Sequence, residues 1–489
     1  MSFRVTLTYA STRLRRYGLV ILFFLVLITP FALKLALGTE PDRTRANGAQ
    51  RLVVITPHVE SIRREFADAF ERWHLEHFGE AVVVDYRTFG GGSEILRYFQ
   101  SSQLLFDRTG TYNIDVVWGG GDYLFDRQLK RGGYLEHILL HDALLKKVYP
   151  SPTLNGLPLF DPAPQPTWFG VALSSFGIVY NRDVLRYLNL PEPKTWRDLT
   201  DAKLLGWFVA GDANRSVSSR QVYMIIVERA MIDAAAAGRS EDQGWAEGMG
   251  LVRLICSNAR YYTDAGSAVP NVIASGDAAV GMAIDFYARA QVDAISGPRG
   301  ESRMGYVEPA GATAISVDPV AIVKGAQHRE LAIRFTEYLL TEEAQRLWNT
   351  RAGAPGGPRS TSLRRLPIMR DLYLNPSNFT DPVDPFDKDF AFASSPKRMA
   401  TLPFLGELIE ISCSNLLDEL RDTRRAIENS PHREALLARL GTFPFDQAEA
   451  LRRAAEFDKA NALQKLELKR RWQEEFRAEY RRLREEAEQ

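Results

Sequence analysis

Hydrophobic residues in the first third of the chain alternate between short continuous runs and segments with helical spacing. The run RLVVIT, residues 51–56, is followed by residues 60–78, whose apolar side chains recur on one helical face. Apolar runs reappear at 81–84 and 114–118, each with a helical segment after it. Strand, short loop and helix in strict alternation predict an α/β fold with a parallel sheet covered by helices.

Three consecutive glycines follow two of these strands, in YRTFGGGSEIL and NIDVVWGGGDYLF. Glycine lets a ligand approach the backbone, and helix N-termini bind anions. The spacing matches neither a P-loop nor a dinucleotide-binding motif. Because ligands bind outside the carboxyl ends of such strands, we expect these loops to be walls of one cleft. The residues concerned are His58, Gly91, Gly92, Ser93, Glu94, Gly120 and Asp122.

A second set of strands and helices occupies the middle of the chain, from GVALSSFGIVYN onward. Serines stand at the start of its long helix, and a Gly-Ser pair precedes a later helix. Hydroxyls, free amides and the positive end of a helix dipole would suit an anion, although a plain serine cap explains the same pattern. The candidate residues are Ser216, Ser218, Ser219, Gly266 and Ser267.

Composition narrows the class of protein. The 489 residues are 45% hydrophobic and 25% charged, which fits a folded protein of two or three domains. Lys plus Arg and Asp plus Glu are both 61, so no excess of positive charge indicates a nucleic-acid partner. Cys256 and Cys413 have no metal-ligand spacing, and either two buried thiols or one bridge is compatible with the sequence.

The N-terminus predicts export. Basic residues precede an apolar run from Gly18 to Leu37, which approaches the length of a membrane span. An uncleaved transmembrane anchor is favoured over a signal peptide cleaved near Ala36–Gly38, and in either case the rest of the chain lies on the extracytoplasmic or periplasmic face. Residues 40–50 then form a polar linker.

The C-terminal part is mostly helical from about Met399. In the charged segment that begins at Phe445, four apolar residues repeat at four, four and three positions, namely Trp472, Phe476, Tyr480 and Leu483. Such a helix either docks on its own domain or offers a contact surface to a partner.

The order of these motifs resembles the periplasmic solute-binding proteins of ATP-driven (ABC) importers, in the branch of ferric-ion, polyamine, thiamine and phosphonate or sugar-phosphate binders. The resemblance covers residues 51–357 and is carried by LVVITPH, NIDVVWGGGDYLFDRQLKRGGYLE, NVIASGDAAVGMAI and DPVAIVKGAQHRELAIRFTEYLLTEEAQRLW. It implies a type II binding-protein fold, in which two lobes joined by crossing strands close around a solute.

The resemblance divides the chain into five parts. After the anchor and linker, residues 1–50, the first part of lobe 1 would span 51–173 and lobe 2 would span 174–305. The chain would return to lobe 1 at 306–357 and end in a helical extension, 358–489.

The sequence leaves two classes of ligand open. In ferric-binding relatives a histidine and adjacent tyrosines hold iron, and His58 and Tyr287 stand at matching places, but Phe286 replaces the second tyrosine and leaves Asp285 beside it. Iron would then need other anionic oxygen ligands. A small solute with phosphate, phosphonate or carboxylate oxygens fits more of the loops, so we expect such a solute, with ferric iron as the alternative.

The resulting expectation is a binding protein that delivers its solute to the permease of an importer and carries no cofactor. No serine-hydrolase elbow, HExxH or kinase loop indicates an enzyme. A membrane-anchored solute sensor and a structural envelope protein are the remaining alternatives.

Overall fold

The computed structural model describes residues 18, 22–29, 49–297 and 301–489. The chain divides into two compact units, residues 1–50 with 74–83, and residues 51–73 with 84–489. Both sheets and the C-terminal helices lie essentially in the second unit, and the site described below lies entirely within it.

The expected N-terminal anchor falls mostly outside the described residues. Residues 22–29 are helical, and their apolar side chains from Leu22 to Ile28 are at least half exposed. Across the described ranges, no helix is both long and apolar enough to cross a membrane. The anchor and the cleavage site near Ala36–Gly38 therefore stay predictions.

The first sheet has six strands in the order β13-β6-β12-β3-β1-β2. Parallel pairing of Val54 with Val116 joins β1 to β3, as the alternating pattern predicted. β12 runs antiparallel to β3 and β6, so the sheet is mixed. The strands are β1 (Gln50–Thr56), β2 (Val82–Thr88), β3 (Val116–Trp118), β6 (Phe169–Ser174), β12 (Ser316–Ile322) and β13 (Leu366–Pro367).

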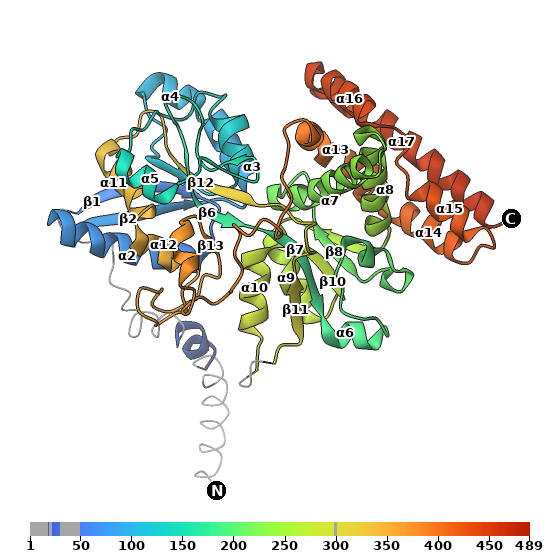
Figure 1. Ribbon diagram of the computed structural model, residues 1–489, viewed down its shortest axis with the longest axis horizontal. Helices are drawn as coiled ribbons and strands as arrows, with labels where there is room; N and C mark the ends of the chain where they lie inside the picture. Colours follow the sequence, from blue (N-terminus) through green and yellow to red (C-terminus); the bar gives the residue numbers. More distant parts are fainter. Residues whose placement is uncertain (1–17, 19–21, 30–48, 298–300) are drawn as a thin grey trace, which may run out of the picture. The chain divides into compact units, whose positions relative to one another are not determined.

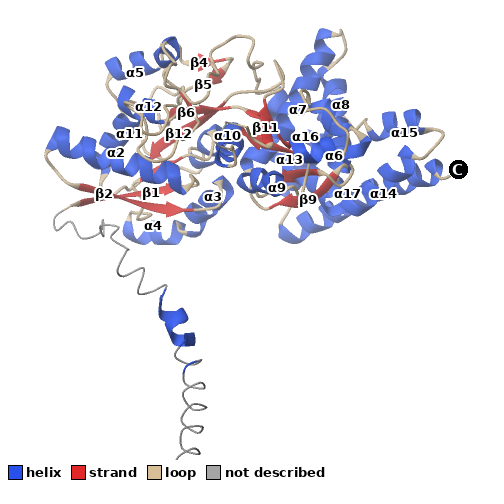
Figure 2. Ribbon diagram, turned by 90° about the horizontal axis from the view of Figure 1, so that it is seen from below, coloured by secondary structure: helices blue, strands red, loops and turns tan. Residues whose placement is uncertain are grey.

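Helices cover the first sheet because its strands are apolar on both faces (Figures 1 and 2). Figure 2 shows α11 and α12 on one side of β1 and α4 on the other. The segment after β12 forms two helices instead of one, because Thr341 caps a new start by accepting the amide of Ala344 at 3.2 Å. The helices are α2 (Glu60–Phe78), α3 (Gly92–Ser101), α4 (Gln103–Thr109), η2 (Leu124–Leu129), α5 (Asp142–Val148), α11 (Arg329–Leu339) and α12 (Glu342–Leu347).

The second sheet has the order β11-β7-β10-β8-β9. Its strands are β7 (Phe176–Asn181), β8 (Phe208–Gly211), β9 (Ala259–Thr263), β10 (Val280–Ile284) and β11 (Met304–Val307). Its helices are α6 (Arg182–Tyr187), α7 (Val217–Ala236), α8 (Glu241–Ser257), α9 (Val269–Ser275) and α10 (Asp285–Ala294). The chain passes from the first sheet to the second between β6 and β7 and returns between β11 and β12, so the expected two-lobe α/β architecture is confirmed.

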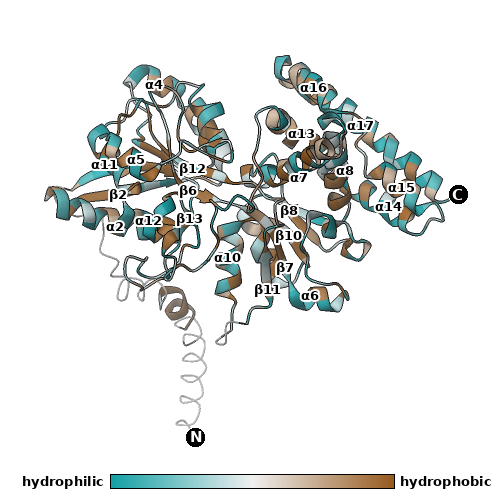
Figure 3. Cartoon of the chain, viewed as in Figure 1, coloured by the Kyte–Doolittle hydropathy of each residue, from teal (hydrophilic) through white to brown (hydrophobic). Residues whose placement is uncertain are grey.

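Two features lie beyond residue 357, where the sequence placed the end of lobe 1. Strand β13 pairs with β6, so the first sheet continues to Pro367. The five helices that follow pack on the second lobe and share its hydrophobic core (Figures 1 and 3). They are α13 (Leu402–Ser412), α14 (Leu417–Glu428), α15 (Arg433–Leu440), α16 (Gln447–Lys459) and α17 (Ala462–Ala487).

The repeating apolar residues of α17 belong to that core. Trp472, Phe476, Tyr480 and Leu483 are each 1% exposed, which agrees with the docked-helix alternative. Tyr480 donates from its hydroxyl to the carbonyl of Ser412. Cys256 and Cys413 are free thiols buried in the same cluster.

We expect Trp472→Ala to lower the free energy of unfolding by about 3–5 kcal/mol, because it leaves a cavity where a whole indole is buried. Leu463→Ala is the control, since Leu463 is 67% exposed and its loss should change stability by less than about 0.5 kcal/mol. Urea unfolding followed by circular dichroism measures both, and equal effects would contradict a docked extension.

Candidate functional site

A cavity of about 110 Å³ lies where the loops after several strands of both sheets meet. Among the residues expected in the cleft, those that line the cavity are His58, Gly91, Gly92, Gly120, Asp122, Ser216, Ser218, Gly266, Ser267 and Tyr287. The structure thus brings most of the candidate residues together, and their binding role stays a prediction.

Four expected residues are not among the lining residues, namely Ser93, Glu94, Ser219 and Asp285. Ser219 is buried behind the first turn of α7, where its hydroxyl donates to Ser216 Oγ at 3.0 Å. Asp285 is fully buried, and its carboxylate accepts the amide of Ser175 at 3.0 Å. Glu94 closes its own loop by accepting the amide of Gly90 at 2.8 Å.

The two triple glycines serve different purposes. Gly119, Gly120 and Gly121 all have positive φ, from 86° to 109°, a conformation that other residues rarely adopt. A Cβ on Gly119 would also lie 2.7 Å from the His58 ring. Gly92 has an ordinary φ but packs tightly, since a Cβ there would lie 3.4 Å from both Gly120 O and Val217 Cγ2.

Helix N-termini from both lobes open onto the cavity. Gly91 and Gly92 begin α3, and Val217 and Ser218 begin α7, and all four residues line the space. Their amides have no acceptor among the described residues, as expected in the first turn of a helix. The combination of bare N–H groups and the positive ends of two dipoles favours a negatively charged ligand.

Ser216 holds this arrangement together. Its Oγ accepts the amide of Ser219 at the start of α7 and the amide of Gly266 from the neighbouring loop, each at 3.2 Å. It also lies 3.1 Å from Ser218 Oγ. Ser216 is therefore a helix cap that fixes two loops, whereas Ser218 retains a hydroxyl at the cavity wall.

The floor of the cavity is a buried group of three side chains. Arg365 Nη1 lies 2.8 Å from Asp318 Oδ2, and His58 Nε2 lies 2.7 Å from the same oxygen. All three are at most 5% exposed. The second carboxylate oxygen of Asp318 accepts the amide of Gly120 at 3.1 Å.

Charge in this group is balanced within the protein. Burial alone would raise the pKa of Asp318, but Arg365 and His58 outweigh it and hold that pKa well below its usual range. Burial lowers the pKa of His58, so the ring is neutral at pH 7. We assign the proton to Nε2, which donates to Asp318, while Nδ1 accepts from Thr56 Oγ1 at 3.0 Å.

Arg365 and Asp318 did not figure among the expected site residues. Arg365 comes from a turn-rich segment without periodicity, 307 residues away from His58 in the chain, and no sequence signal marks it. Asp318 had a signal, since a carboxylate followed by proline interrupts the apolar strand β12. The register of β12 on β6 shifts at this point.

A ferric ion does not fit these residues well. Both ring nitrogens of His58 are engaged in hydrogen bonds, and the Arg365 guanidinium lies 3.0 Å from Nε2. Burial raises the pKa of Tyr287 to about 12, which keeps its phenol protonated. Within the described residues, no group of three or more His, Cys, Asp or Glu could hold a metal.

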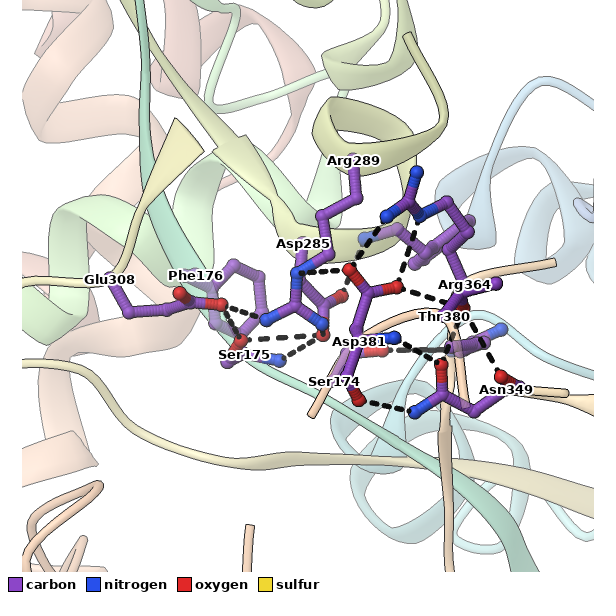
Figure 4. Close-up of polar contacts among 12 residues, drawn as sticks. Ser174, Ser175, Phe176, Asp285, Arg289, Glu308, Asn349, Arg364, Thr380 and Asp381 are labelled. Carbon is purple, nitrogen blue, oxygen red and sulfur yellow. Dashed lines mark hydrogen bonds and ion pairs between the residues drawn. The ribbon is translucent and has the colours of Figure 1, made fainter. Parts of the chain in front are cut away.

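Behind the cavity, a polar network joins the strands that cross between the lobes (Figure 4). Ser175 follows β6, and its hydroxyl donates to Glu308, which follows β11, at 2.9 Å. Arg289 on α10 pairs with Glu308 and lies 3.9 Å from Asp381, which precedes the C-terminal helices. Both crossings and the start of the extension are thereby tied to α10.

Comparison with known proteins agrees with this architecture. Residues 133–367 match the family of bacterial extracellular solute-binding proteins, and the resemblance to binding proteins of ABC importers is confirmed. The phosphoglycerate transport regulatory protein PgtC of Salmonella typhimurium is 23% identical over 277 residues, 57% of this chain. The chain spans 59% of the length of that relative.

Two solved structures share the fold. The periplasmic binding protein AfuA of Actinobacillus pleuropneumoniae, with fructose-6-phosphate bound, superposes with a TM-score of 0.51 at 18% identity, covering 76% of this chain and 97% of AfuA. The periplasmic binding protein P5PA has the same TM-score at 17% identity and covers 76% of this chain and 98% of its own.

We expect Asp318→Asn to lower the free energy of unfolding by about 3–5 kcal/mol, because it leaves Arg365 buried without a counter-charge. Urea unfolding at pH 7 measures the loss. A change below 1 kcal/mol would show that the three-residue group does not stabilise the fold.

Stability should also depend on Asp122, because burial raises the pKa of this carboxyl to about 6. The folded chain then holds a proton that the unfolded chain releases near the ordinary value of 3.8, so ionised Asp122 costs stability as pH rises from about 4 to 6. We expect Asp122→Asn to gain stability relative to the wild type across that window. Unfolding curves at several pH values test this, and a pH-independent difference would contradict it.

Proposed function

We propose that this chain, whose residues 133–367 match the bacterial extracellular solute-binding family, is the solute-binding component of an ABC importer and captures a small phosphate- or carboxylate-bearing solute. The observation that carries the proposal is that the N-termini of α3 and α7, one from each lobe, open onto one cavity. An anion bound there would bridge the lobes and favour their closed arrangement.

The chemistry of the cavity supports an anion over a cation. Asp318 is already neutralised by Arg365, and burial, which raises the pKa of Asp122 to about 6, makes the charged form of that carboxyl less favourable than it is in water. The amides of α3 and α7 and the hydroxyl of Ser218 remain as donors. The names of similar proteins point to the same class, since PgtC is described as a phosphoglycerate transport regulator and AfuA was solved with fructose-6-phosphate.

The solute would be handed to a permease in the membrane, because proteins of this family serve such transporters. Ferric iron is a weaker candidate, because both ring nitrogens of His58 are hydrogen-bonded and the phenol of Tyr287 stays protonated. The lobes could equally report the bound solute to a membrane partner, as a sensor does, and the binding chemistry would be the same.

We expect the purified full-length chain to bind 3-phosphoglycerate or fructose-6-phosphate, and Ser218→Ala to weaken that binding about tenfold or more. A hydrogen bond to a charged group contributes about 1.5–3 kcal/mol, which corresponds to that factor. Isothermal titration calorimetry measures the affinity. Ferric citrate serves as the competing probe.

Ser219→Ala is the matched control. Ser219 is one residue away and bonds to the same Ser216, but it does not line the cavity. We expect it to change stability and leave affinity unchanged. Equal effects of the two variants, or tight binding of ferric citrate alone, would overturn the proposal of an oxyanion site.

A further inference from the structure

A second and larger cavity adjoins the first. It encloses about 620 Å³, within the roughly 300–1,000 Å³ that is usual for small-molecule sites, whereas the first cavity is smaller than that range. Asp122, Tyr123 and Gln221 line both cavities, so the two are contiguous. The first cavity alone therefore suits only the head group of a solute, and the rest of a larger solute would continue into the second.

The walls of the second cavity come from distant parts of the chain. Arg127, Arg131 and Trp168 lie on the wall that lobe 1 provides. Residues 394–403 and Asp458 on α16 form the opposite wall, so the C-terminal extension completes the cavity.

The C-terminal wall is anchored on both sides. The buried carboxylate of Glu228 on α7 accepts the amide of Ser395 at 2.8 Å and the hydroxyl of Ser394 at 2.9 Å. On the lobe 1 side, Asn155 donates from Nδ2 to the carbonyl of Ala391 at 3.2 Å. Asn155 lies in the hairpin of β4 (Thr153–Leu154) and β5 (Leu157–Pro158). The wall is therefore a fixed part of the cavity.

Charges of both signs line the second cavity and nearly balance. Its carboxylates are Asp122, Asp126 and Asp458, and its arginines are Arg127 and Arg131. Arg127 pairs with Asp126 at 3.3 Å, and Arg131 is exposed. A second anionic group on the solute would find no surplus of positive charge among these described residues, and a cationic group would approach arginines as well as carboxylates. The cavity therefore favours a part of the solute without net charge.

Polar side chains at the junction of the two cavities are suited to hydroxyl groups. Burial raises the pKa of Asp122 to about 6, so its carboxylate is mostly charged at pH 7 and accepts hydrogen bonds. The Gln221 side chain forms no hydrogen bond with any residue that the structure describes, and its amide can both donate and accept. Burial also raises the pKa of Tyr123, so its hydroxyl stays protonated.

Apolar side chains form much of the remaining wall. Leu157 and Trp168 lie on the lobe 1 side, and Met399 lies on the side of the extension. Apolar and aromatic surface with a few placed polar groups is typical of sites for small organic ligands. In such a site the C–H groups of a polyol pack on the apolar wall while its hydroxyls reach the polar groups.

We propose that the second cavity receives an uncharged, hydroxyl-bearing tail of the solute, while the anionic head group binds at the N-termini of α3 and α7. This rests on the proposed function, which supplies the head group. The tail passes Tyr123 and Gln221 at the junction. Its hydroxyls bond to Asp122 and Asp458, and its C–H groups pack on Trp168. The solute is then a phosphorylated or carboxylated polyol at least as long as a hexose, and the C-terminal extension is a third wall of its site.

Two phosphate esters with different tails test the proposal. Glycerol 3-phosphate ends in a short chain, whereas fructose 6-phosphate carries a sugar. In calorimetry with the full-length chain, we expect fructose 6-phosphate to bind about tenfold more tightly than glycerol 3-phosphate, because its tail makes additional hydrogen bonds to charged groups. Ala400 lines the second cavity from the 3₁₀ helix η7 (Arg398–Thr401). Ala400→Trp should remove the difference between the esters and leave the affinity for glycerol 3-phosphate unchanged.

Ala435→Trp is the matched control, because Ala435 is exposed on α15 and lines neither cavity. Asp458→Asn is a second variant, chosen because Asp458 is exposed and its replacement leaves the core intact. If Ala400→Trp weakens both esters equally, Asp458→Asn decides. A loss confined to fructose 6-phosphate supports the tail site, and an equal loss or none overturns it.

The affinities of the wild type separate this proposal from the proposed function. Equal affinity for the two esters overturns the tail site and leaves the proposed function standing. Tighter binding of 6-aminohexyl phosphate than of fructose 6-phosphate also overturns it, since that tail is cationic. If neither ester binds, the proposed function fails and the tail site fails with it.

Discussion

The ion pair between Arg365 and Asp318 is the interaction on which the site depends. It lies at most 5% exposed and joins the segment before β13 to the middle of β12, with His58 after β1 as a third member. Asp318 also accepts the amide of Gly120, so the same carboxylate positions the second triple-glycine loop. Removing a buried charge from its partner is costly, and this group therefore fixes the floor of the cavity.

Much of the cavity wall follows from local sequence. Loops after parallel strands meet at one edge of a sheet, so the strand pattern was enough to place His58, Gly92, Gly120 and Asp122 near one another. A serine cap is equally local, and it brought Ser216 and Ser218 to the start of α7. The alternation of strands and helices predicted sheets covered by helices, whereas the two-lobe arrangement followed from the resemblance of the motif order to solute-binding proteins.

Long-range partners could not be predicted in the same way. Arg365 reaches the site through the pairing of a two-residue strand, β13, which leaves no periodic trace. The amphipathic pattern of α17 marked Trp472 and Phe476 as an apolar stripe, but a stripe does not name the surface that it covers. That surface is set by tertiary packing against α13, α14 and α8.

Residues 391–395 are hydrogen-bonded to both lobes, since Ala391 accepts from Asn155 and Ser395 donates to Glu228. These bonds affect how far the lobes can move apart. Two-lobed binders usually open about their crossing strands alone, and the crossings here are joined to α10 by buried polar bonds. A third strap, held by Asn155 in one lobe and Glu228 in the other, restricts the angle through which the lobes can separate. For the proposed solute-binding role, such a strap predicts slow exchange, so that the lifetime of the loaded state, more than the affinity, would set the rate of delivery.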